Sequence, residues 1–252
     1  MPSSETAPRT VIIGGTAGIG LATAQHLAAE GHAVTVVGRS PQRIDEAVAS
    51  ITAKNGGGVQ GRSADMTDRA SLDALFAGLG EFEHLVVTAP GDGSPGSLAD
   101  LDLTALHSAF NTKFIAYANA VQAALPHLDQ RTGSITFVSA ASAQTALPGA
   151  AGLAAVNGAV EAIVPTLALE LAPIRVNAVS PGVIDTAWWD RVVPAEERSG
   201  LMAAFATTIP AGRVGRPEEI ADAIALLVRN GFLTGVVLPI DGGARFKPQA
   251  RA

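Results

Sequence analysis

The sequence predicts one α/β domain built around a doubly wound parallel sheet with helices on both faces. Short runs rich in Val and Ile alternate with longer Ala-rich segments, which is the pattern of repeated strand–helix–strand units. The chain has 252 residues, 48% of them hydrophobic and 16% charged, which is enough for a single large core. In such folds ligands bind outside the carboxyl ends of the strands, where the strand order reverses.

The expected elements follow one another along the chain. The strands are short and apolar, as expected where both faces are covered, and they span 10–13, 33–37, 59–63, 84–88, 134–139, 175–179 and 236–240. The helices are expected over 18–30, 41–54, 68–77, 103–127, 151–172 and 217–229. Ser40-Pro41 and Pro217 are typical helix starts. The stretch 187–209 interrupts the alternation.

Composition excludes several classes of function. The formal net charge is −6, and no basic cluster resembles a nucleic-acid footprint. The five His and the acidic residues lack metal-ligand spacing, and without Cys there is neither a disulfide nor a catalytic thiol. The start lacks the regions of a signal peptide, and charges or turn residues interrupt every apolar run. We expect a cytoplasmic protein that acts on a small molecule, with no metal, nucleic acid or membrane.

A glycine-rich turn follows the first expected strand and opens the first helix. Gly14 permits a tight turn, Gly18 lets the backbone approach a phosphate, and Gly20 allows close packing of the helix. The helix then presents free N–H groups and the positive end of its dipole to a pyrophosphate. This arrangement predicts a dinucleotide cofactor.

The end of the second expected strand selects between cofactors. An acid at this place would bind the ribose 2′-hydroxyl of NAD, but the sequence is Val37-Gly38-Arg39-Ser40. Arg39 could pair with a 2′-phosphate instead, which favours NADP(H) over NAD(H). The alternative is a solvated Arg39 in an ordinary loop.

Across residues 9–243 the chain resembles the short-chain dehydrogenase/reductase (SDR) family, which has a Rossmann fold. The resemblance rests on the glycine turn, on the segment 175–182 (Arg-Val-Asn-Ala-Val-Ser-Pro-Gly) and on Asp241-Gly242-Gly243. Thr88-Ala89-Pro90 matches the family's Asn-Asn-Ala-Gly poorly. The resemblance implies flexible tails at 1–8 and 244–252. It also implies cofactor contacts from Gly14, Thr16, Gly18, Ile19, Gly20, Arg39, Ser40, Asp65, Met66, Ala89, Pro181, Gly182, Ile184 and Thr186.

The family's catalytic positions are where this chain departs from the pattern. In the family a Ser ends strand five, a Tyr-x-x-x-Lys pair follows on the next helix, and a helix Asn supports the Lys. Ser139 matches the Ser position, with Ser142 as a second candidate, and Asn111 matches the Asn. The same alignment places Leu153 at the Tyr position and Asn157 at the Lys position.

No alternative register restores the pair. A gap of one residue would move the two positions to Gly152 and Val156, and no Lys lies between Lys113 and Lys247. The only Tyr, Tyr117, is expected to pack inside the preceding helix. Leu153 cannot donate a proton, and an Asn carries no charge, although it can still bond a ribose. Other candidate proton donors are Asp185, Asp190, His107 and Asp92, each of which could equally be a surface or loop-capping residue.

The resemblance also places a substrate lid over 187–210. Its apolar side chains include Trp188, Trp189, Met202 and Phe205, which could cover a flat apolar substrate under a mobile flap. The alternative is that this segment covers the core or a subunit contact. Ala-rich faces on 103–127 and 151–172, the dimer helices of the family, imply a homodimer or homotetramer.

Three functions fit these residues. The first is an NADP(H)-dependent SDR oxidoreductase with a non-standard active site, acting, if at all, on a small, partly apolar carbonyl or imine-like substrate. The second is a catalytically silent NADP(H)-binding sensor or scaffold. The third is a non-redox cyclase or isomerase that reuses the pocket. Retained cofactor residues beside missing proton-transfer residues are compatible with all three.

Overall fold

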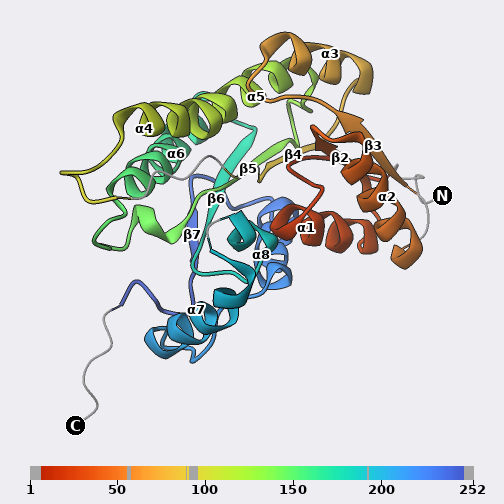
Figure 1. The fold of residues 1–252 in the computed structure, drawn as a ribbon. Coiled ribbons are helices and arrows are strands. Elements are labelled where there is room, and N and C mark those ends of the chain that lie inside the picture. Colours follow the sequence, from red (N-terminus) through yellow and green to blue (C-terminus); the bar gives the residue numbers. More distant parts are fainter. Residues whose placement is uncertain (1–6, 56–57, 89, 91–95, 192, 247–252) are drawn as a thin grey trace.

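The computed structural model describes residues 7–55, 58–88, 90, 96–191 and 193–246. At its centre is a parallel sheet with the order β3-β2-β1-β4-β5-β6-β7 (Figure 1). The strands are β1 (Arg9–Ile13), β2 (Ala33–Gly38), β3 (Val59–Ser63), β4 (His84–Val87), β5 (Ser134–Val138), β6 (Arg175–Pro181) and β7 (Val237–Ile240). The order reverses between β1 and β4, so the predicted doubly wound fold is confirmed.

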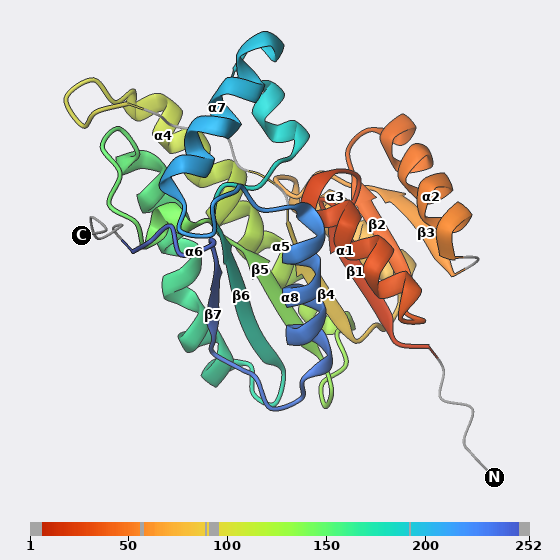
Figure 2. The same ribbon diagram turned by 90° about the horizontal axis from the view of Figure 1, so that it is seen from below.

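Helices cover both faces of the sheet and enclose two cores (Figures 1 and 2). One face carries α1 (Gly18–Ala29), α2 (Pro41–Asn55) and α8 (Pro217–Arg229), and the other carries α3 (Arg69–Leu79), α5 (Ala116–Ala124) and α6 (Ala151–Glu170). Neighbouring strand residues face opposite cores, as Val11 and Ile12 do. Because successive residues enter one core and then the other, strands that are covered on both faces consist of consecutive apolar residues.

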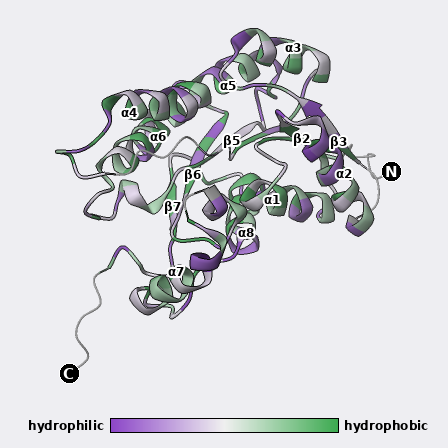
Figure 3. Ribbon diagram, viewed as in Figure 1, coloured by the Kyte–Doolittle hydropathy of each residue, from purple (hydrophilic) through white to green (hydrophobic). Residues whose placement is uncertain are grey.

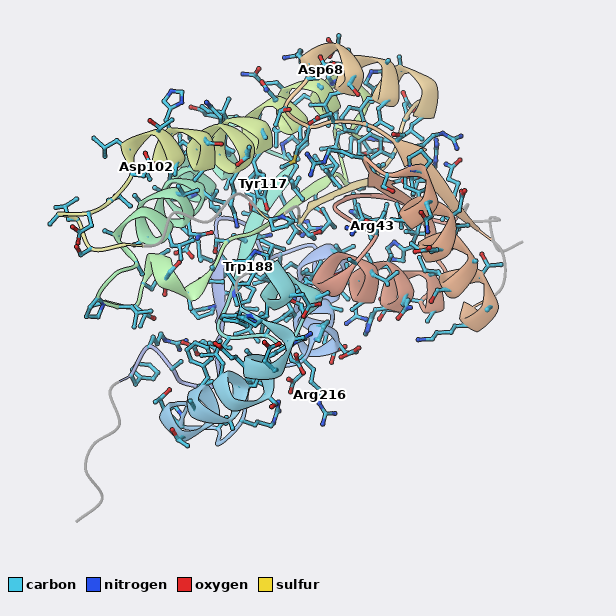
Figure 4. All side chains as sticks on the ribbon, viewed as in Figure 1. Arg43, Asp68, Asp102, Tyr117, Trp188 and Arg216 are labelled. Atoms are coloured by element: carbon cyan, nitrogen blue, oxygen red, sulfur yellow. The ribbon has the colours of Figure 1, made fainter. Side chains whose placement is uncertain are left out.

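Short polar side chains fix where several helices begin (Figure 4). Asp68 and Asp102 precede α3 and α4 (Leu103–Phe110), and each accepts a hydrogen bond from the backbone N–H two residues later, at 3.0 and 2.8 Å. At the start of α8, the Glu219 carboxylate accepts the backbone N–H of Arg216 at 2.8 Å. These caps bind N–H groups that have no partner within the helix.

The predicted continuous helix over 103–127 is divided into four segments. A π-helical turn, η1 (Asn111–Ile115), lies between α4 and α5, and a 3-10 turn, η2 (Leu125–His127), ends the run. The apolar periodicity that predicted the helix does not distinguish a π-turn from α-helix, so the sequence missed the break. Single π-turns inside helices occur frequently at functional sites. This one begins at Asn111 and includes the buried Lys113.

The stretch 187–209 contains a helix that the sequence analysis did not predict. After the turn η4 (Ala187–Arg191), α7 spans Ala195–Thr208 and has no buried residue. Figure 2 shows α7 standing beyond the end of the sheet that lies away from the N-terminus. Glu196 and Glu197 favour its first turn through the helix dipole. Because α7 buries no apolar stripe, its sequence lacks the periodicity that reveals a core helix.

Helix α6 is long and apolar. It is 20 residues long, and an 18-residue stretch of it has a mean hydropathy of 1.5 (Figure 3), with 33% of that stretch buried. By length and composition it could therefore cross a membrane, although Glu161 and Pro165 interrupt the run as expected. This is weak evidence for a membrane, because core helices of soluble proteins have the same properties. The helix packs on β6 and contributes Val160 and Val164 to the core.

The residues assigned to the two tails include some that bond to the domain. Pro8 accepts a hydrogen bond from the backbone N–H of Ala33 at 2.9 Å. At the other end, the guanidinium of Arg245 lies 3.0 Å from the carboxylate of Asp241. These contacts hold Pro8 against β2 and Arg245 against the turn that follows β7.

Candidate cofactor and active site

The turn between β1 and α1 has a shape that only glycines allow. Gly14 and Gly18 have φ values of +82° and +51°, in the left-handed region where a side chain is strained. A Cβ on Gly20 would lie 2.2 Å from the carbonyl oxygen of Gly14 and 2.5 Å from the hydroxyl of Thr88. The backbone therefore forms a cradle without side chains at the N-terminus of α1. This cradle fits the pyrophosphate of a dinucleotide.

The ends of three strands meet at this turn. The hydroxyl of Thr88, which follows β4, lies 3.1 Å from the carbonyl oxygens of both Ile13 and Gly14. A Cβ on Gly18 would lie 3.4 Å from the methyl group of Thr186, in the loop after β6. The structure thus brings Thr186 to the glycine turn. Thr88 holds that turn in place, a role the sequence analysis missed because Thr88 departs from the family pattern.

The residues expected near the adenosine lie at the ends of β2 and β3. Arg39 is exposed there, and Arg43, in the first turn of α2, is exposed as well (Figure 4). Hydrogen bonds from the backbone and hydroxyl of Thr67 lower the pKa of Asp65, and the charge of Arg39 adds to this effect. Arg39 and Asp65 are therefore neighbours in space. The predicted contact Ala89 lies outside the described residues.

Asn157, which the sequence resemblance places at the family's Lys position, is a buried amide. Asn157 is 4% exposed, and its Nδ2 donates to the carbonyl oxygen of Leu153 at 2.9 Å and to Oγ of Ser142 at 3.2 Å. Its Oδ1 is buried and has no hydrogen-bond partner within the part of the chain that the structure describes. Asn157 therefore has a spare acceptor. Ser142, the second candidate for the catalytic Ser, is the serine that contacts it.

Ser139 takes part in a different network, centred on Glu161. Its hydroxyl donates to Oε1 of Glu161 at 2.6 Å and also lies 3.1 Å from the carbonyl oxygen of Val179. The hydroxyl of Ser180 donates to the same Oε1 at 2.7 Å, and Nε2 of Gln144 donates to Oε2 at 2.8 Å. Glu161 thereby connects the ends of β5 and β6. The sequence analysis missed it, although it lies one helical turn after Asn157 on the same face.

Two buried ionisable residues come from the helix that precedes β5. Lys113 in η1 is 9% exposed; burial lowers its pKa to about 8, and the charge of Glu161 opposes that shift. Tyr117 is fully buried, and its hydroxyl donates to the carbonyl oxygen of Val138 at 3.1 Å (Figure 4). Burial raises the pKa of Tyr117 above its usual range. The prediction that Tyr117 packs inside its helix is confirmed.

The other candidate proton donors have local partners. His107 Nδ1 lies 3.0 Å from the side-chain amide of Asn111, at the exposed start of η1. Arg198 of α7 pairs with Asp185 at 2.7 Å and with Asp190 at 2.5 Å, and also donates to the carbonyl oxygen of Thr186 at 3.0 Å. These ion pairs fix both carboxylates. Asp92 lies outside the described residues.

The predicted lid residues form an aromatic cluster at the base of α7. Trp189 donates through Nε1 to the carbonyl oxygen of Ile184 at 2.9 Å, and its ring centroid lies 5.5 Å from that of Phe205. Trp188 packs edge-on against Trp189 at 4.9 Å, and both rings are half-buried (Figure 4). Met202, on α7, is half-buried too. Through Trp189 and Arg198, the predicted lid segment is hydrogen-bonded to the loop that carries Ile184 and Thr186.

Comparison with known proteins identifies the family. Residues 14–245 match the family model named Enoyl-(Acyl carrier protein) reductase. The chain is 33% identical over 244 residues to "Short-chain dehydrogenase/reductase ATR9" of Stachybotrys chlorohalonatus (strain IBT 40285), covering 93% of this chain and 95% of that protein.

Two solved structures are similar over nearly the whole chain. A small-chain dehydrogenase in complex with NADPH has a TM-score of 0.80 and 32% identity, over 95% of this chain and 99% of the other. An NADPH-bound short chain oxidoreductase from Pseudomonas aeruginosa PAO1, said to contain an atypical catalytic center, has a TM-score of 0.86 and 29% identity, over 94% and 96%. With the glycine cradle, the strand order and these likenesses together, the chain belongs to the short-chain dehydrogenase/reductase family.

Proposed function

We propose that the protein is an NADP(H)-dependent oxidoreductase with a non-standard active site, acting on a small, partly apolar carbonyl or imine-like substrate. One observation carries the choice of cofactor: the turn before α1 forms a glycine cradle. The non-standard active site rests on the sequence resemblance, which places Leu153 and the neutral Asn157 of α6 at the family's Tyr and Lys positions. The atypical catalytic center of the Pseudomonas relative supports the view that SDR proteins with altered centres still bind NADPH.

The preference for NADP(H) over NAD(H) rests on Arg39. When bound, the cofactor would supply the hydride, or accept one in the reverse direction. Arg39 would pair with its 2′-phosphate, and the N-terminus of α1 would bind its pyrophosphate. Thr186 lies beside the same turn. The amide of Asn157, whose Oδ1 is buried and without a partner in the described residues, would have to turn to accept a hydrogen bond from a hydroxyl of the nicotinamide ribose. The relative solved with NADPH supports this choice of cofactor.

Leu153 and Asn157, at the expected Tyr and Lys positions, favour a substrate that needs no proton from these two residues. A ketone that accepts a hydride becomes an alkoxide and must be protonated, which neither Leu153 nor Asn157 can do. An iminium ion that accepts a hydride becomes a neutral amine, so no proton has to move in that step. The half-buried ring of Trp188 provides a flat apolar surface near the site. Imine-like substrates are therefore favoured over simple ketones.

The assembly and the location belong to the same proposal. Helix α6 is apolar and largely uncovered, and Leu103 of α4, Ile115 of η1 and Leu169 of α6 are 69%, 44% and 83% exposed. Pairing these helices across a twofold axis would cover such surface, which supports a homodimer or homotetramer. Light scattering on the purified protein would measure the mass in solution. We propose a cytoplasmic location as well.

NADPH oxidation tests the proposal. The purified protein is supplied with NADPH and either a preformed cyclic iminium or a simple ketone of similar size, and the loss of NADPH absorbance is followed. We expect turnover of the iminium and much slower or no turnover of the ketone. Binding of NADPH without oxidation on either substrate would favour the sensor or scaffold. Conversion of a substrate without oxidation of NADPH would favour the cyclase or isomerase. Failure to bind NADPH would overturn both the oxidoreductase and the sensor or scaffold.

A further inference from the structure

A buried ammonium and a half-buried carboxylate lie beneath the ends of β5 and β6. Glu161 comes from α6 and Lys113 from η1, which pack against each other. The Lys113 ammonium lies 5.7 Å from the centroid of the Tyr117 ring, on the inner side of its helix. The charge of Glu161 acts on Lys113 strongly enough to oppose the effect of burial on its pKa. The two groups form one electrostatic unit within the protein.

This unit is connected to the segment where the cofactor would lie. Oε1 of Glu161 accepts the hydroxyls of Ser139 and Ser180, at 2.6 and 2.7 Å. Ser180 immediately precedes Pro181 and Gly182, which are predicted cofactor contacts. The carboxylate is thus separated from that turn by a single side chain. Together with Gln144, the two serines make three donors to this carboxylate.

The oxidised nicotinamide carries one positive charge more than the reduced form. A nearby carboxylate therefore favours the oxidised cofactor, and a nearby ammonium favours the reduced one. In the wild type, the Glu161 carboxylate and the Lys113 ammonium act on the cofactor in opposite directions. Removing either charge leaves the effect of the other unopposed. Unit charges separated by about 10 Å at an effective dielectric constant of about 20 change an equilibrium roughly tenfold.

We propose that Lys113 and Glu161 act as a positioning pair that sets the electrostatic potential at the nicotinamide and so balances the binding of oxidised against reduced cofactor. The inference rests on the proposed function, because it requires that NADP(H) binds. On this proposal, Lys113 and Glu161 supply charge beside the site, although Asn157, at the expected position of the family's Lys, is neutral.

The test compares dissociation constants of NADP⁺ and NADPH, measured by calorimetry below pH 8, where Lys113 is protonated. In Glu161→Gln the uncovered ammonium should raise the ratio of the NADP⁺ constant to the NADPH constant roughly tenfold. In Lys113→Met the uncovered carboxylate should lower it by a similar factor. The double variant should return the ratio close to that of the wild type. Glu170→Gln and Lys54→Met, at exposed helix ends, are the matched controls.

A purely structural role would shift both constants in the same direction and leave the ratio unchanged. The inference would be overturned if both single variants kept the wild-type ratio of the two dissociation constants, or if both changed it in the same direction. Either result would leave the proposed function standing. A wild type that binds neither cofactor would overturn the proposed function and this inference with it.

The wild type provides a second measurement that needs no folded variant. As the pH rises through about 8, Lys113 loses its charge, and the ratio should fall towards that of Lys113→Met. The titratable groups on the elements around Lys113 are Glu161 and the exposed Glu170 on α6, Tyr117 on α5 and His107 on α4, and β5 contributes none. Buried Tyr117 stays neutral because its pKa is raised. A ratio that is constant across this range would contradict the inference.

Discussion

The amino and carboxyl edges of the sheet both contain buried polar side chains, but in different arrangements. At the amino edge, His32 bonds Thr10 and His84 bonds Ser134, each at 2.9 Å. At the carboxyl edge, Glu161 gathers hydroxyls from two strands, and Asn157 keeps an acceptor without a partner in the described chain. The amino edge therefore pairs these polar side chains with one another, whereas the carboxyl edge leaves one buried amide oxygen without a partner in the described chain.

Arg175 illustrates how the amino edge is completed. Its guanidinium donates to the carbonyl oxygens of Leu227 and Val228, at 2.6 and 2.8 Å, at the end of α8. A cation at the carboxyl end of a helix is favoured by the dipole and satisfies carbonyls that lack partners. A cavity of about 640 Å³ lies beside it, lined by residues that include His32, His84 and Arg175. The polar groups beside this cavity are bonded to one another and to the end of α8.

The largest expected effect is a gain of function at the carboxyl edge. Restoring the family pair with Leu153→Tyr and Asn157→Lys should raise ketone reduction by about 10²–10⁴, the usual contribution of a positioned general acid. Tyr alone should give less, because without a nearby cation its pKa stays near 10. Initial rates with NADPH and a generic ketone would measure this. If the wild type already reduces ketones at ordinary rates, another group supplies the proton.

The glycine cradle should be the most sensitive point for cofactor binding. In Gly20→Ala the new methyl group would meet the Gly14 carbonyl at 2.2 Å, so the turn must open. Forced overpacking costs about 1–3 kcal/mol, which corresponds to a roughly 10- to 100-fold weaker affinity for NADPH. Gly78→Ala on α3 is the control, because its Cβ would meet no atom within 4 Å. Equal NADPH affinity in the two variants would argue against the cradle as the binding site.

Replacing Arg39 should change the relative affinity for NADPH and NADH without changing the stability that the amino edge provides. Arg39→Asp would remove the partner of the 2′-phosphate and add a partner for a ribose hydroxyl, so NADPH should lose about 1.5–3 kcal/mol relative to NADH. Calorimetric titration of both cofactors checks this, and thermal unfolding should be unchanged because Arg39 is exposed. Unchanged relative affinities would mean that Arg39 is only a solvated loop residue.

The buried His84 at the amino edge should make the stability of the fold depend on pH. Burial, with a smaller contribution from His32, lowers the pKa of His84 to about 3. Because this lies below the unfolded value of 6.5, the folded state binds fewer protons, and the stability present above pH 6.5 is lost as the pH falls towards 3. The loss should be about 1.4 kcal/mol per pH unit. Urea unfolding of wild type and His84→Gln would measure it, and identical pH profiles would contradict the assignment.

The sequence alone determined the elements whose signals are local. Each predicted strand matches an observed one to within two residues at either end, because parallel strands covered on both faces are short apolar runs. The glycine turn was recognisable because left-handed backbone and close approach require glycine at fixed spacing. Helix α7 and the π-turn at Asn111 were missed, since neither has a periodicity that distinguishes it from its surroundings.

Tertiary structure alone decided which side chains meet at the carboxyl edge. Ser139 directly follows β5, Glu161 lies on α6 and Ser180 on β6. No spacing in the chain indicates that one carboxylate binds both hydroxyls. Arg198 likewise reaches Asp185 only because α7 folds back over the loop after β6. Local sequence sets backbone conformation through sterics and periodicity, whereas partners distant in the chain are set by how the helices pack on the sheet.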